Sequence, residues 1–403
     1  MTGTQRRRRV LFVAEAVTLA HVARPLVLAR SLDPASYEVH FACADRFAFA
    51  FGNETFTRWP IESISTGRFL RALAGGRRLY DYRTLARYAV ADRVLLEQIQ
   101  PDLVVGDFRL SLAVSAPLAG IPYATITNAY WSPYARGSYP LPDLPMVRFL
   151  GVTLSELLFR AVQPAAFAYH ARPLNRLRRE HGLPSFDDIS HTYTHADYTL
   201  YADCPGLVPV FNNPGNHHYL GPIHWSPPAT RPDWWEKLPG DIPVVYVSFG
   251  SSGRVALLGK VLQALEGLPV SVIVATAGRV QPGTLPENVR VADYLPGDEA
   301  AARSALVICN GGSPAVYQAL GAGVPVLGLP TNMDQYLNMR YVQAQGAGIG
   351  LRSDVTGGSA VRAAVQSLLQ DESCRLAAVA LQAELRQYNA AERFNGLVDA
   401  WLG

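Results

Sequence analysis

The sequence has few cysteines, few lysines and no long apolar run. Its four cysteines, at positions 43, 204, 309 and 374, lie far apart, and none has the CxxC spacing of a metal or redox motif. This spacing argues against a zinc site and a disulfide framework, and it indicates reduced thiols in a cytoplasmic protein. No window contains the roughly 20 uncharged apolar residues that a membrane helix needs, which excludes a membrane-spanning protein.

Charge of either sign is also scarce. The 36 basic and 33 acidic residues leave a formal net charge of +3. This balance excludes a nucleic-acid binder that works by neutralising phosphates. The one basic run, residues 6–9, precedes the apolar stretch 10–14 and mimics the start of a signal peptide, but Glu15 interrupts the pattern. We expect a solvated tail that leads into a first buried strand.

Short β-rich apolar runs alternate with longer segments of helical period along the 403 residues. The runs do not alternate polar with apolar residues, which is typical of parallel strands covered by helices on both faces. Repeated strand–helix–strand order predicts a doubly wound α/β fold. The predicted strands cover residues 10–14, 37–43, 103–106, 123–127, 198–201, 244–249, 270–275, 289–292, 306–309 and 324–329.

A proline-rich stretch divides the chain. Residues 221–243 contain six prolines and show no sustained period, which is the composition of a semi-rigid linker. The length favours two domains, and we place them at residues 1–221 and 243–403, joined by a linker at 222–242. The last helix can pack back on the first domain. Because ligands bind beyond the carboxyl ends of parallel strands, we expect the site in a cleft between the two sheets.

A glycine turn follows the predicted strand 306–309. Gly311 and Gly312 allow close backbone approach, and Ser313 is a good N-cap for the helix that follows. Pro314 then occupies the first helical position, where its missing N–H has no consequence. The free N–H groups of such a helix N-terminus suit a phosphate or diphosphate, although many turns of this kind bind nothing.

The next residues add a strand and an acid–amide pair, in the order Gly321-Ala-Gly-Val-Pro-Val-Leu-Gly-Leu-Pro-Thr-Asn-Met-Asp334-Gln335-Tyr-Leu-Asn338. With the Gly-Gly turn, this stretch resembles the donor-binding signature of family 1 glycosyltransferases of the GT-B fold, a family that includes macrolide glycosyltransferases and UDP-glucuronosyltransferases. The resemblance implies two Rossmann-like domains, the first binding the acceptor and the second the nucleotide sugar. It also implies that Asp334 and Gln335 hold sugar hydroxyls, which a carboxylate and an amide can both do; the alternative is a capping or turn role.

Two positions depart from the family pattern. Asn310 stands where the family has His before Gly-Gly, and it offers phosphate a neutral donor without a charge. Residues 294–297 stand where the family usually has Pro-Gln in the base-binding loop, which leaves the preferred nucleobase open. Neither change removes the helix N-terminus. The expected donor site includes Leu295, Asn310, Gly311, Gly312 and Ser313.

A second turn completes the expected donor site. Gly250, Ser251 and Ser252 follow the predicted strand 244–249 and resemble the family's first C-domain turn, which also meets the diphosphate. Hydroxyls and exposed N–H groups at a strand end suit that role, and an ordinary tight turn is the alternative. Arg254 follows at once and could supply the charge that Asn310 lacks, or it could be solvated.

A histidine and an aspartate of the first domain complete the resemblance. Ala20-His21-Val-Ala-Arg-Pro25 resembles the family's Gly-His-Val-x-Pro segment, in which the His is the general base. Pro25 marks an early turn of the next helix, so we expect His21 in the loop before it. A base of this kind needs a carboxylate that orients the imidazole. Asp107, after a buried strand, occupies the corresponding family position; its alternative role is to cap the next helix.

No Asp-x-Asp motif occurs in the sequence. Metal-dependent glycosyltransferases commonly use such a pair to hold a divalent cation on the diphosphate. We therefore predict no metal and no cofactor beyond the nucleotide-sugar co-substrate, with the helix dipole and backbone donors stabilising the leaving phosphate.

Aromatic residues concentrate in two loops of the first domain, at residues 47–51 and 128–134. Aromatic-lined clefts suit flat or apolar acceptors, so Phe49, Tyr130 and Trp131 are candidate acceptor-binding residues. Core packing explains these aromatics equally well.

Together these features predict an inverting, metal-independent glycosyltransferase that moves a hexose to a hydroxyl of a small apolar acceptor, such as a natural-product aglycone. A UDP-sugar is the first candidate donor and a dTDP-deoxysugar, for example a rhamnose donor, is the second. Two other classes stay open: a non-catalytic sugar-nucleotide binder that assists a partner enzyme, and a sugar-nucleotide epimerase. The run at residues 346–350 leads into a strand-like segment and does not match a dinucleotide-binding fingerprint.

Overall fold

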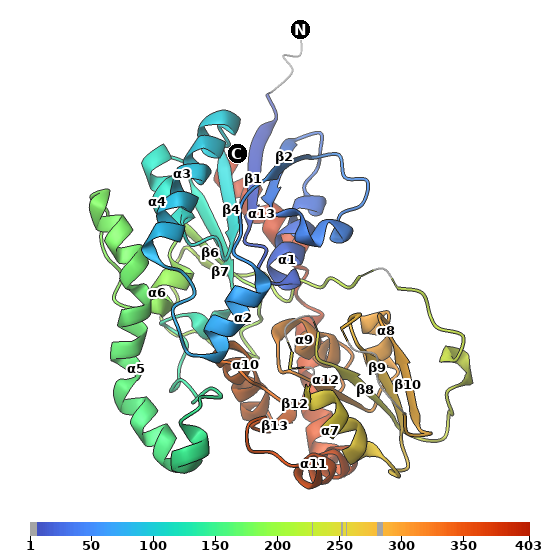
Figure 1. The fold of residues 1–403 in the computed structure, drawn as a ribbon. Helices are drawn as coiled ribbons and strands as arrows, with labels where there is room; N and C mark the ends of the chain where they lie inside the picture. The colour runs from blue at the N-terminus through green and yellow to red at the C-terminus, as the bar shows by residue number, and fades with distance from the viewer. Residues whose placement is uncertain (1–5, 228, 251–252, 255, 280–284) are drawn as a thin grey trace. The chain divides into compact units, whose positions relative to one another are not determined.

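The chain folds into two α/β units, each built on one parallel sheet (Figure 1). The computed structural model describes residues 6–227, 229–250, 253–254, 256–279 and 285–403. Unit 1 comprises Met1–Gly137, Arg160–Ile223 and Tyr388–Gly403, whereas unit 2 comprises Ser138–Phe159 and His224–Gln387. The doubly wound α/β fold expected from the apolar, non-alternating strands is confirmed.

These units differ from the contiguous domains expected at 1–221 and 243–403. Residues 138–159 belong to unit 2 because Asp143 is bonded there: its N–H donates to the Thr331 carbonyl oxygen at 3.3 Å, and its carboxylate accepts from Tyr336. Part of the expected linker also belongs to unit 2, in which Trp235 is buried. Local composition marks the proline-rich stretch, whereas these long-range contacts depend on the folded chain.

Unit 1 contains a seven-stranded sheet in the order β3-β2-β1-β4-β5-β6-β7. Its strands are β1 (Arg8–Ala14), β2 (Tyr37–Cys43), β3 (Thr57–Pro60), β4 (Leu103–Asp107), β5 (Tyr123–Thr127), β6 (Tyr198–Tyr201) and β7 (His217–Tyr219). Its helices are α1 (Leu19–Ser31), α2 (Thr66–Ala74), α3 (Tyr82–Ile99), α4 (Leu112–Ala119), α6 (Ile189–Thr194) and α13 (Ala390–Leu402), with short 3-10 turns η1 (Asp45–Ala50) and η2 (Ala129–Trp131).

The side chains of β1 show why helices cover both faces of this sheet. Successive strand residues point to opposite faces. Leu11 and Val13 therefore share a core with apolar residues of α3 and α4, whereas Phe12 packs against Phe394 of α13. The last helix thus packs within unit 1, where it also contacts α1.

Unit 2 contains a six-stranded sheet in the order β10-β9-β8-β11-β12-β13. Its strands are β8 (Val244–Ser248), β9 (Ser271–Ala275), β10 (Val289–Ala292), β11 (Leu306–Cys309), β12 (Val326–Gly328) and β13 (Gly348–Gly350). Its helices are α7 (Ala256–Leu265), α8 (Gly297–Ala302), α9 (Ser313–Gly321), α10 (Met333–Ala344), α11 (Gly358–Gln370) and α12 (Glu372–Leu385), with the 3-10 turn η3 (Trp235–Lys237). The long helix α5 (Val147–Glu180) begins in unit 2 and ends in unit 1.

Every predicted strand is present, with bounds that differ by at most two residues. The apolar pattern did not predict β3, β7 and β13, because all three are edge strands with little burial. An edge strand needs no apolar run on both faces, so its sequence lacks the signal that identifies central strands.

Each sheet has one point at which the strand order reverses, between β1 and β4 in unit 1 and between β8 and β11 in unit 2. In open parallel sheets, ligands bind outside the carboxyl ends of the strands at such a point, because the connections there leave in opposite directions. His21 and Asp107 follow or end β1 and β4, and the turns at Gly250 and Gly311 follow β8 and β11.

Candidate active site and donor site

His21 lies in the first turn of α1, not in the loop before it as expected from Pro25. The helix begins at Leu19 and continues through Pro25, so the proline lies inside the helix. Because Pro25 has no N–H, it cannot donate the usual helical hydrogen bond to the carbonyl oxygen of His21. The imidazole is partly exposed, and its ring stacks on Phe108 with centroids 4.7 Å apart.

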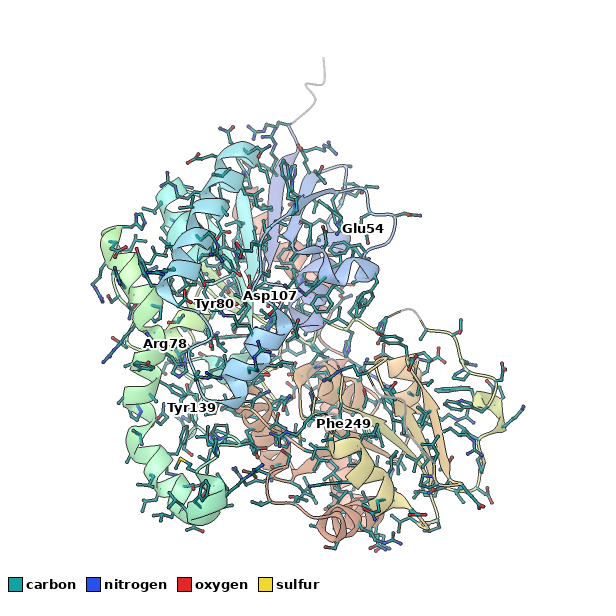
Figure 2. All side chains as sticks on the ribbon, viewed as in Figure 1. Glu54, Arg78, Tyr80, Asp107, Tyr139 and Phe249 are labelled. Atoms are coloured by element: carbon teal, nitrogen blue, oxygen red, sulfur yellow. The ribbon has the colours of Figure 1, made fainter. Side chains whose placement is uncertain are left out.

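Asp107 ends β4 and is fully buried. Its Oδ1 lies 2.8 Å from Nδ1 of His21. The alternative role as a helix cap is not observed, since the N-cap of α4 is Ser111. A carboxylate accepts, so this contact requires the hydrogen on Nδ1 and leaves the lone pair of the imidazole on Nε2. The two residues expected to act together are therefore in contact. Figure 2 labels Asp107 among the side chains of unit 1.

Sequence reasoning missed a third member of this group, Arg24. Its guanidinium donates to both carboxylate oxygens of Asp107, at 2.9 Å from Nε and 2.8 Å from Nη2, and Nη2 lies 3.3 Å from Nδ1 of His21. A paired fork of this kind fixes a carboxylate in one orientation. Arg24 follows His21 by one helical turn, so the spacing was a signal, but an arginine in a helix is usually solvated.

The guanidinium of Arg24 continues into a buried polar chain. Its Nη1 donates to Oδ1 of Asn128 at 2.8 Å, and Nδ2 of Asn128 donates to both oxygens of Asp203 at 3.1 and 3.2 Å. Asn128 follows β5, and Asp203 follows β6. Polar residues from four neighbouring elements thus fix the geometry around His21 and Asp107.

Aromatic side chains surround the same edge of the sheet. Phe108 has a positive φ of 59° and contacts Phe69, Tyr80 and Tyr193 as well as His21. Of the predicted acceptor residues, Trp131 packs edge-on against Tyr193 at 5.1 Å and so lies next to this cluster.

The other two predicted acceptor residues lie differently. Tyr130 is buried, as the core-packing alternative expected, and Phe49 is exposed in η1, where it contacts Phe47. The structure therefore brings Trp131 into contact with Tyr193 of the aromatic cluster around Phe108.

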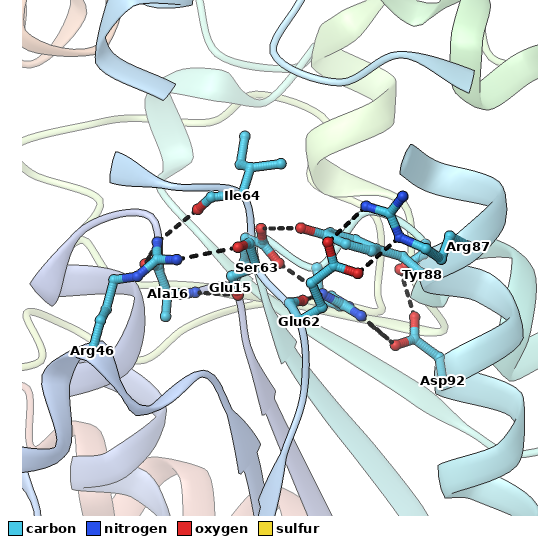
Figure 3. Close-up of polar contacts among 11 residues, drawn as sticks. Glu15, Ala16, Arg46, Glu62, Ser63, Ile64, Arg87, Tyr88 and Asp92 are labelled. Atoms are coloured by element: carbon cyan, nitrogen blue, oxygen red, sulfur yellow. Dashed lines mark hydrogen bonds and ion pairs between the residues drawn. The ribbon is translucent and has the colours of Figure 1, made fainter. Parts of the chain in front are cut away.

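A second charged group of unit 1 includes Glu15 and Asp92, which Figure 3 labels. Arg109, which is fully buried, donates to Glu15 at 2.8 Å and to Asp92 at 3.0 Å. The N–H of Glu15 in turn donates to the Asp107 carbonyl oxygen at 3.0 Å. Burial raises the pKa of Glu15 above its ordinary value, and the charge of Arg109 opposes that rise. This group ties the loops after β1 and β4 together.

In unit 2, bonds from neutral side chains hold the backbone of the glycine turn after β11. Oδ1 of Asn310 accepts from the N–H of Gly312 at 3.1 Å, which is a local turn bond. Helix α9 then begins at Ser313 with Gly312 as N-cap, so the expectation that Ser313 is the N-cap is wrong by one residue. The side-chain bond of Asn310 shapes the turn and lets the helix start earlier.

Position 311 in this turn requires glycine. Its φ is +76°, and a Cβ there would lie 2.5 Å from Cγ of Met339. Its carbonyl oxygen accepts from Nδ2 of Asn338 at 2.9 Å, and its N–H donates to the sulfur of Cys309 at 3.2 Å. Burial raises the pKa of that thiol to about 12, so Cys309 is a structural residue and no nucleophile.

The acid–amide pair begins helix α10. Asp334 is partly exposed in the first turn, whereas Gln335 is buried. The Oε1 atom of Gln335 accepts from the N–H of Thr331 at 2.9 Å and from its hydroxyl at 3.1 Å. The side-chain oxygen of Gln335 therefore closes the loop after β12, which is the turn role given above as the alternative. Its Nε2 has no partner among the described residues.

The second predicted turn is only partly described. Gly250 has a φ of +57°, while Ser251 and Ser252 lie outside the described residues. Arg279, which the sequence did not single out, donates from Nη1 to the carbonyl oxygens of Gly250 at 3.1 Å and Gly253 at 2.9 Å. Leu295 is buried, so its side chain belongs to the core of unit 2.

Arg254 is exposed to solvent, as the solvated alternative expected, but it is also paired. Its Nη1 lies 3.5 Å from Oδ2 of Asp143, whose carboxylate also accepts from Ser353 and Tyr336, each at 2.6 Å. Burial raises the pKa of Asp143, and these hydrogen bonds oppose the rise. Part of the positive charge at this strand end is therefore balanced within unit 2.

The described residues contain no group of three or more His, Cys, Asp or Glu side chains placed to hold a metal ion. Within the same described ranges, no helix combines the length and the hydropathy that crossing a membrane requires.

The two parallel-sheet α/β units have the GT-B fold of glycosyltransferases. Residues 259–392 match the family described as "Erythromycin biosynthesis protein CIII-like, C-terminal domain". A solved structure, the spinosyn rhamnosyltransferase SpnG complexed with thymidine diphosphate, superposes with a TM-score of 0.69 at 20% identity, over 97% of this chain and 99% of that chain.

Curated relatives then give the family. A "PGL/p-HBAD biosynthesis glycosyltransferase" of Mycobacterium tuberculosis (strain ATCC 25177 / H37Ra) is 55% identical over 93% of this chain and 87% of its own length. A "PGL/p-HBAD biosynthesis rhamnosyltransferase" of Mycobacterium bovis (strain BCG / Pasteur 1173P2) is 53% identical over 93% of this chain and 84% of its own. The chain belongs to this family of glycosyltransferases.

Proposed function

We propose that the protein is an inverting, metal-independent glycosyltransferase that moves a hexose from a nucleoside diphosphate sugar to a hydroxyl of a small apolar acceptor. The observation that carries this proposal is the 2.8 Å contact between Nδ1 of His21 and Asp107 at the carboxyl edge of the unit 1 sheet. It leaves Nε2 as a base, and a protein that only binds nucleotide sugars needs none.

In the proposed reaction, Nε2 of His21 takes the proton from the acceptor hydroxyl. The acceptor oxygen forms a bond to the anomeric carbon as the bond to the diphosphate breaks, which inverts that carbon. Asp107 stabilises the imidazolium that forms, and Arg24 holds Asp107 in place. The aromatic side chains beside His21 favour an apolar acceptor.

In the proposed donor site, the backbone N–H groups at the start of α9 hold the diphosphate, together with the turn at Gly250 to Ser252. The nine residues of α9 give a helix dipole that favours the charge of the leaving group. Asp334 and Nε2 of Gln335 bind sugar hydroxyls, while Oε1 of Gln335 remains bonded to Thr331. No metal or further cofactor takes part.

For the donor, names of relatives favour dTDP-deoxysugars over UDP-hexoses. One curated relative is named a rhamnosyltransferase, and the solved rhamnosyltransferase with the same fold is complexed with thymidine diphosphate. We place the reaction in the cytoplasm, where activated sugars are made.

The test is a donor panel. Binding and hydrolysis of UDP-glucose and dTDP-rhamnose are measured by calorimetry and nucleotide release, before and after exhaustive EDTA treatment. Turnover of either sugar that survives EDTA supports the proposal. Activity that is lost with EDTA and restored by magnesium or manganese contradicts the metal-independent mechanism, and epimerisation of the donor without any acceptor contradicts the transferase.

A further inference from the structure

The start of α5, drawn in green in Figure 1, has large apolar side chains exposed to solvent. Phe149 is 84% exposed and Leu157 is 67% exposed. Leu150, Leu154 and Leu158 are also exposed, and all five residues belong to unit 2. Single exposed leucines are ordinary, but five within ten residues form a patch. We call these five residues the apolar patch.

Helix geometry gathers three residues of the patch on one face, whereas Phe149 and Leu150 precede a kink at Gly151, whose φ of 72° is not helical. Leu154, Leu157 and Leu158 are spaced by three and four residues, which places them within an arc of about 100°. Ser155, between them in sequence, is fully buried and marks the inward face. A helix that packs on a core normally buries its leucines. Here the three leucines are exposed and the serine is buried.

The charges around the patch are positive. Arg148 and Arg160 bracket it in sequence and are both exposed, and Glu156 is the single acidic residue from 147 to 160. Leucine and phenylalanine between arginines are typical of helices that lie in the plane of a membrane interface. Such a helix need not span the bilayer, and none of the described helices does.

The composition and size of the patch favour lipid over protein. Protein–protein hot spots are rich in Trp and Tyr, which residues 147–160 lack, and leucine is under-represented in them. The five side chains expose roughly 500 Å², whereas a standard interface buries about 800 Å² on each partner. A hydrocarbon surface requires no such matched area.

We propose that the apolar patch, with Arg148 and Arg160, docks the protein on an anionic lipid surface. The leucines and Phe149 enter the boundary between headgroups and acyl chains, and the two guanidinium groups bind the lipid phosphates. This surface is independent of the proposed transfer reaction, because none of its residues belongs to the candidate sites.

The experiment is co-sedimentation of the full chain with lipid vesicles. Vesicles of phosphatidylcholine, with and without about 30% phosphatidylglycerol, are compared at low and high salt. We expect the wild type to bind the anionic vesicles and to lose binding as salt rises. The double variant Phe149→Ser/Leu157→Ser should lower the partition coefficient roughly tenfold or more, since two large apolar groups no longer enter the bilayer.

A matched control comes from α3, where Val90 is 64% and Val94 is 57% exposed. Val90→Ser/Val94→Ser removes similar apolar exposure in unit 1 and should leave vesicle binding unchanged. Arg148→Gln/Arg160→Gln should reduce the preference for anionic over neutral vesicles. Thermal melts check that each variant folds, which substitution of exposed residues should permit.

Three outcomes would overturn the proposal. The wild type does not sediment with either vesicle, or the control variant loses binding as much as the patch variant does. In the third, the wild type binds no vesicles and light scattering shows a dimer, which Phe149→Ser/Leu157→Ser converts to a monomer. The patch would then be the contact with a second copy of the chain. Nucleotide binding by the same samples tests the proposed function separately.

Discussion

The two units arrange their candidate residues by different means. In unit 1, the His21 site is held by side chains: Asp107 meets His21 and Arg24, and Arg24 continues through Asn128 to Asp203. In unit 2, the turn after β11 is held by bonds between its backbone groups and neutral side chains, with Gly311 in a left-handed conformation and Asn310 closing the turn.

This difference fits a division of chemistry between the units. A base must hold one proton at one atom, which requires ionised groups with few alternative partners. A diphosphate instead presents many oxygens, and several fixed N–H dipoles bind it without a titratable group. Changes in unit 1 should therefore alter turnover and its pH dependence, and changes in unit 2 should alter nucleotide affinity.

The largest expected effect is on turnover. His21→Ala removes the proposed base and should lower kcat by about 10²–10⁴-fold, with nucleotide affinity measured by calorimetry little changed. Asp107→Asn should cost less, and its effect should disappear in the His21→Ala background, because Asp107 acts through the imidazole. Near-normal kcat in His21→Ala with a hydroxyl acceptor would break the comparison, since unit 1 would then hold no base.

The next effect is on the stability of unit 1. Arg109→Met leaves Glu15 and Asp92 buried without their counter-charge and should lower the free energy of unfolding by about 3–5 kcal/mol. Arg87→Met is the matched control, because its bond to Glu62 is exposed and should contribute at most about 1 kcal/mol. Chemical denaturation measures both, and equal losses would show that the buried group has no special role.

The same pair predicts a pH dependence with a defined sign. Because burial raises the pKa of Glu15, the folded state holds its proton more tightly than the unfolded state does. This contribution to stability is complete below the unfolded value near 4.5 and is lost as pH rises through the folded value. The loss in Arg109→Met should therefore be larger at pH 8 than at pH 5, and a reversed order would contradict the assignment to Glu15.

In unit 2, Gly311→Ala should destabilise the turn by about 1–3 kcal/mol, because alanine disfavours a φ of +76° and its Cβ would meet Met339. Affinity for UDP or dTDP should fall with it. Gly259→Ala on α7, where a Cβ meets nothing within 4 Å, should instead be neutral or stabilising. Unchanged nucleotide affinity in a destabilised Gly311→Ala would remove the turn from the donor site.

The smallest effect would sharpen the electrostatic side of the comparison. Asn310→His introduces a titratable group beside the turn and should tighten nucleotide binding more at pH 6 than at pH 8. Since Arg254 already lies near Asp143, we expect this gain to be similar with and without Arg254→Gln. Calorimetric titrations give the ratio of nucleotide affinity at pH 6 to that at pH 8. The same ratio in Asn310→His and in the wild type would place Asn310 away from the phosphates.

The sequence by itself determined the local structure. Apolar runs without alternation identified the central strands, and the Gly-Gly turn with its Pro314 identified a helix N-terminus, because each signal lies within a few residues. The family resemblance also selected His21 and Asp107, which the structure brings into contact. The sequence did not predict the edge strands β3, β7 and β13, whose residues are too exposed to show a pattern.

Tertiary structure alone decided which distant side chains meet. Arg24, Asn128 and Asp203 are unremarkable in sequence, and only strand order brings their loops to one edge of the sheet. The same holds for Asp143. It lies in the segment 138–159, which belongs to unit 2, and it pairs with Arg254. Polar and charged pairs between residues far apart in sequence leave no local periodicity, because the partner of a buried polar group is chosen by packing and desolvation.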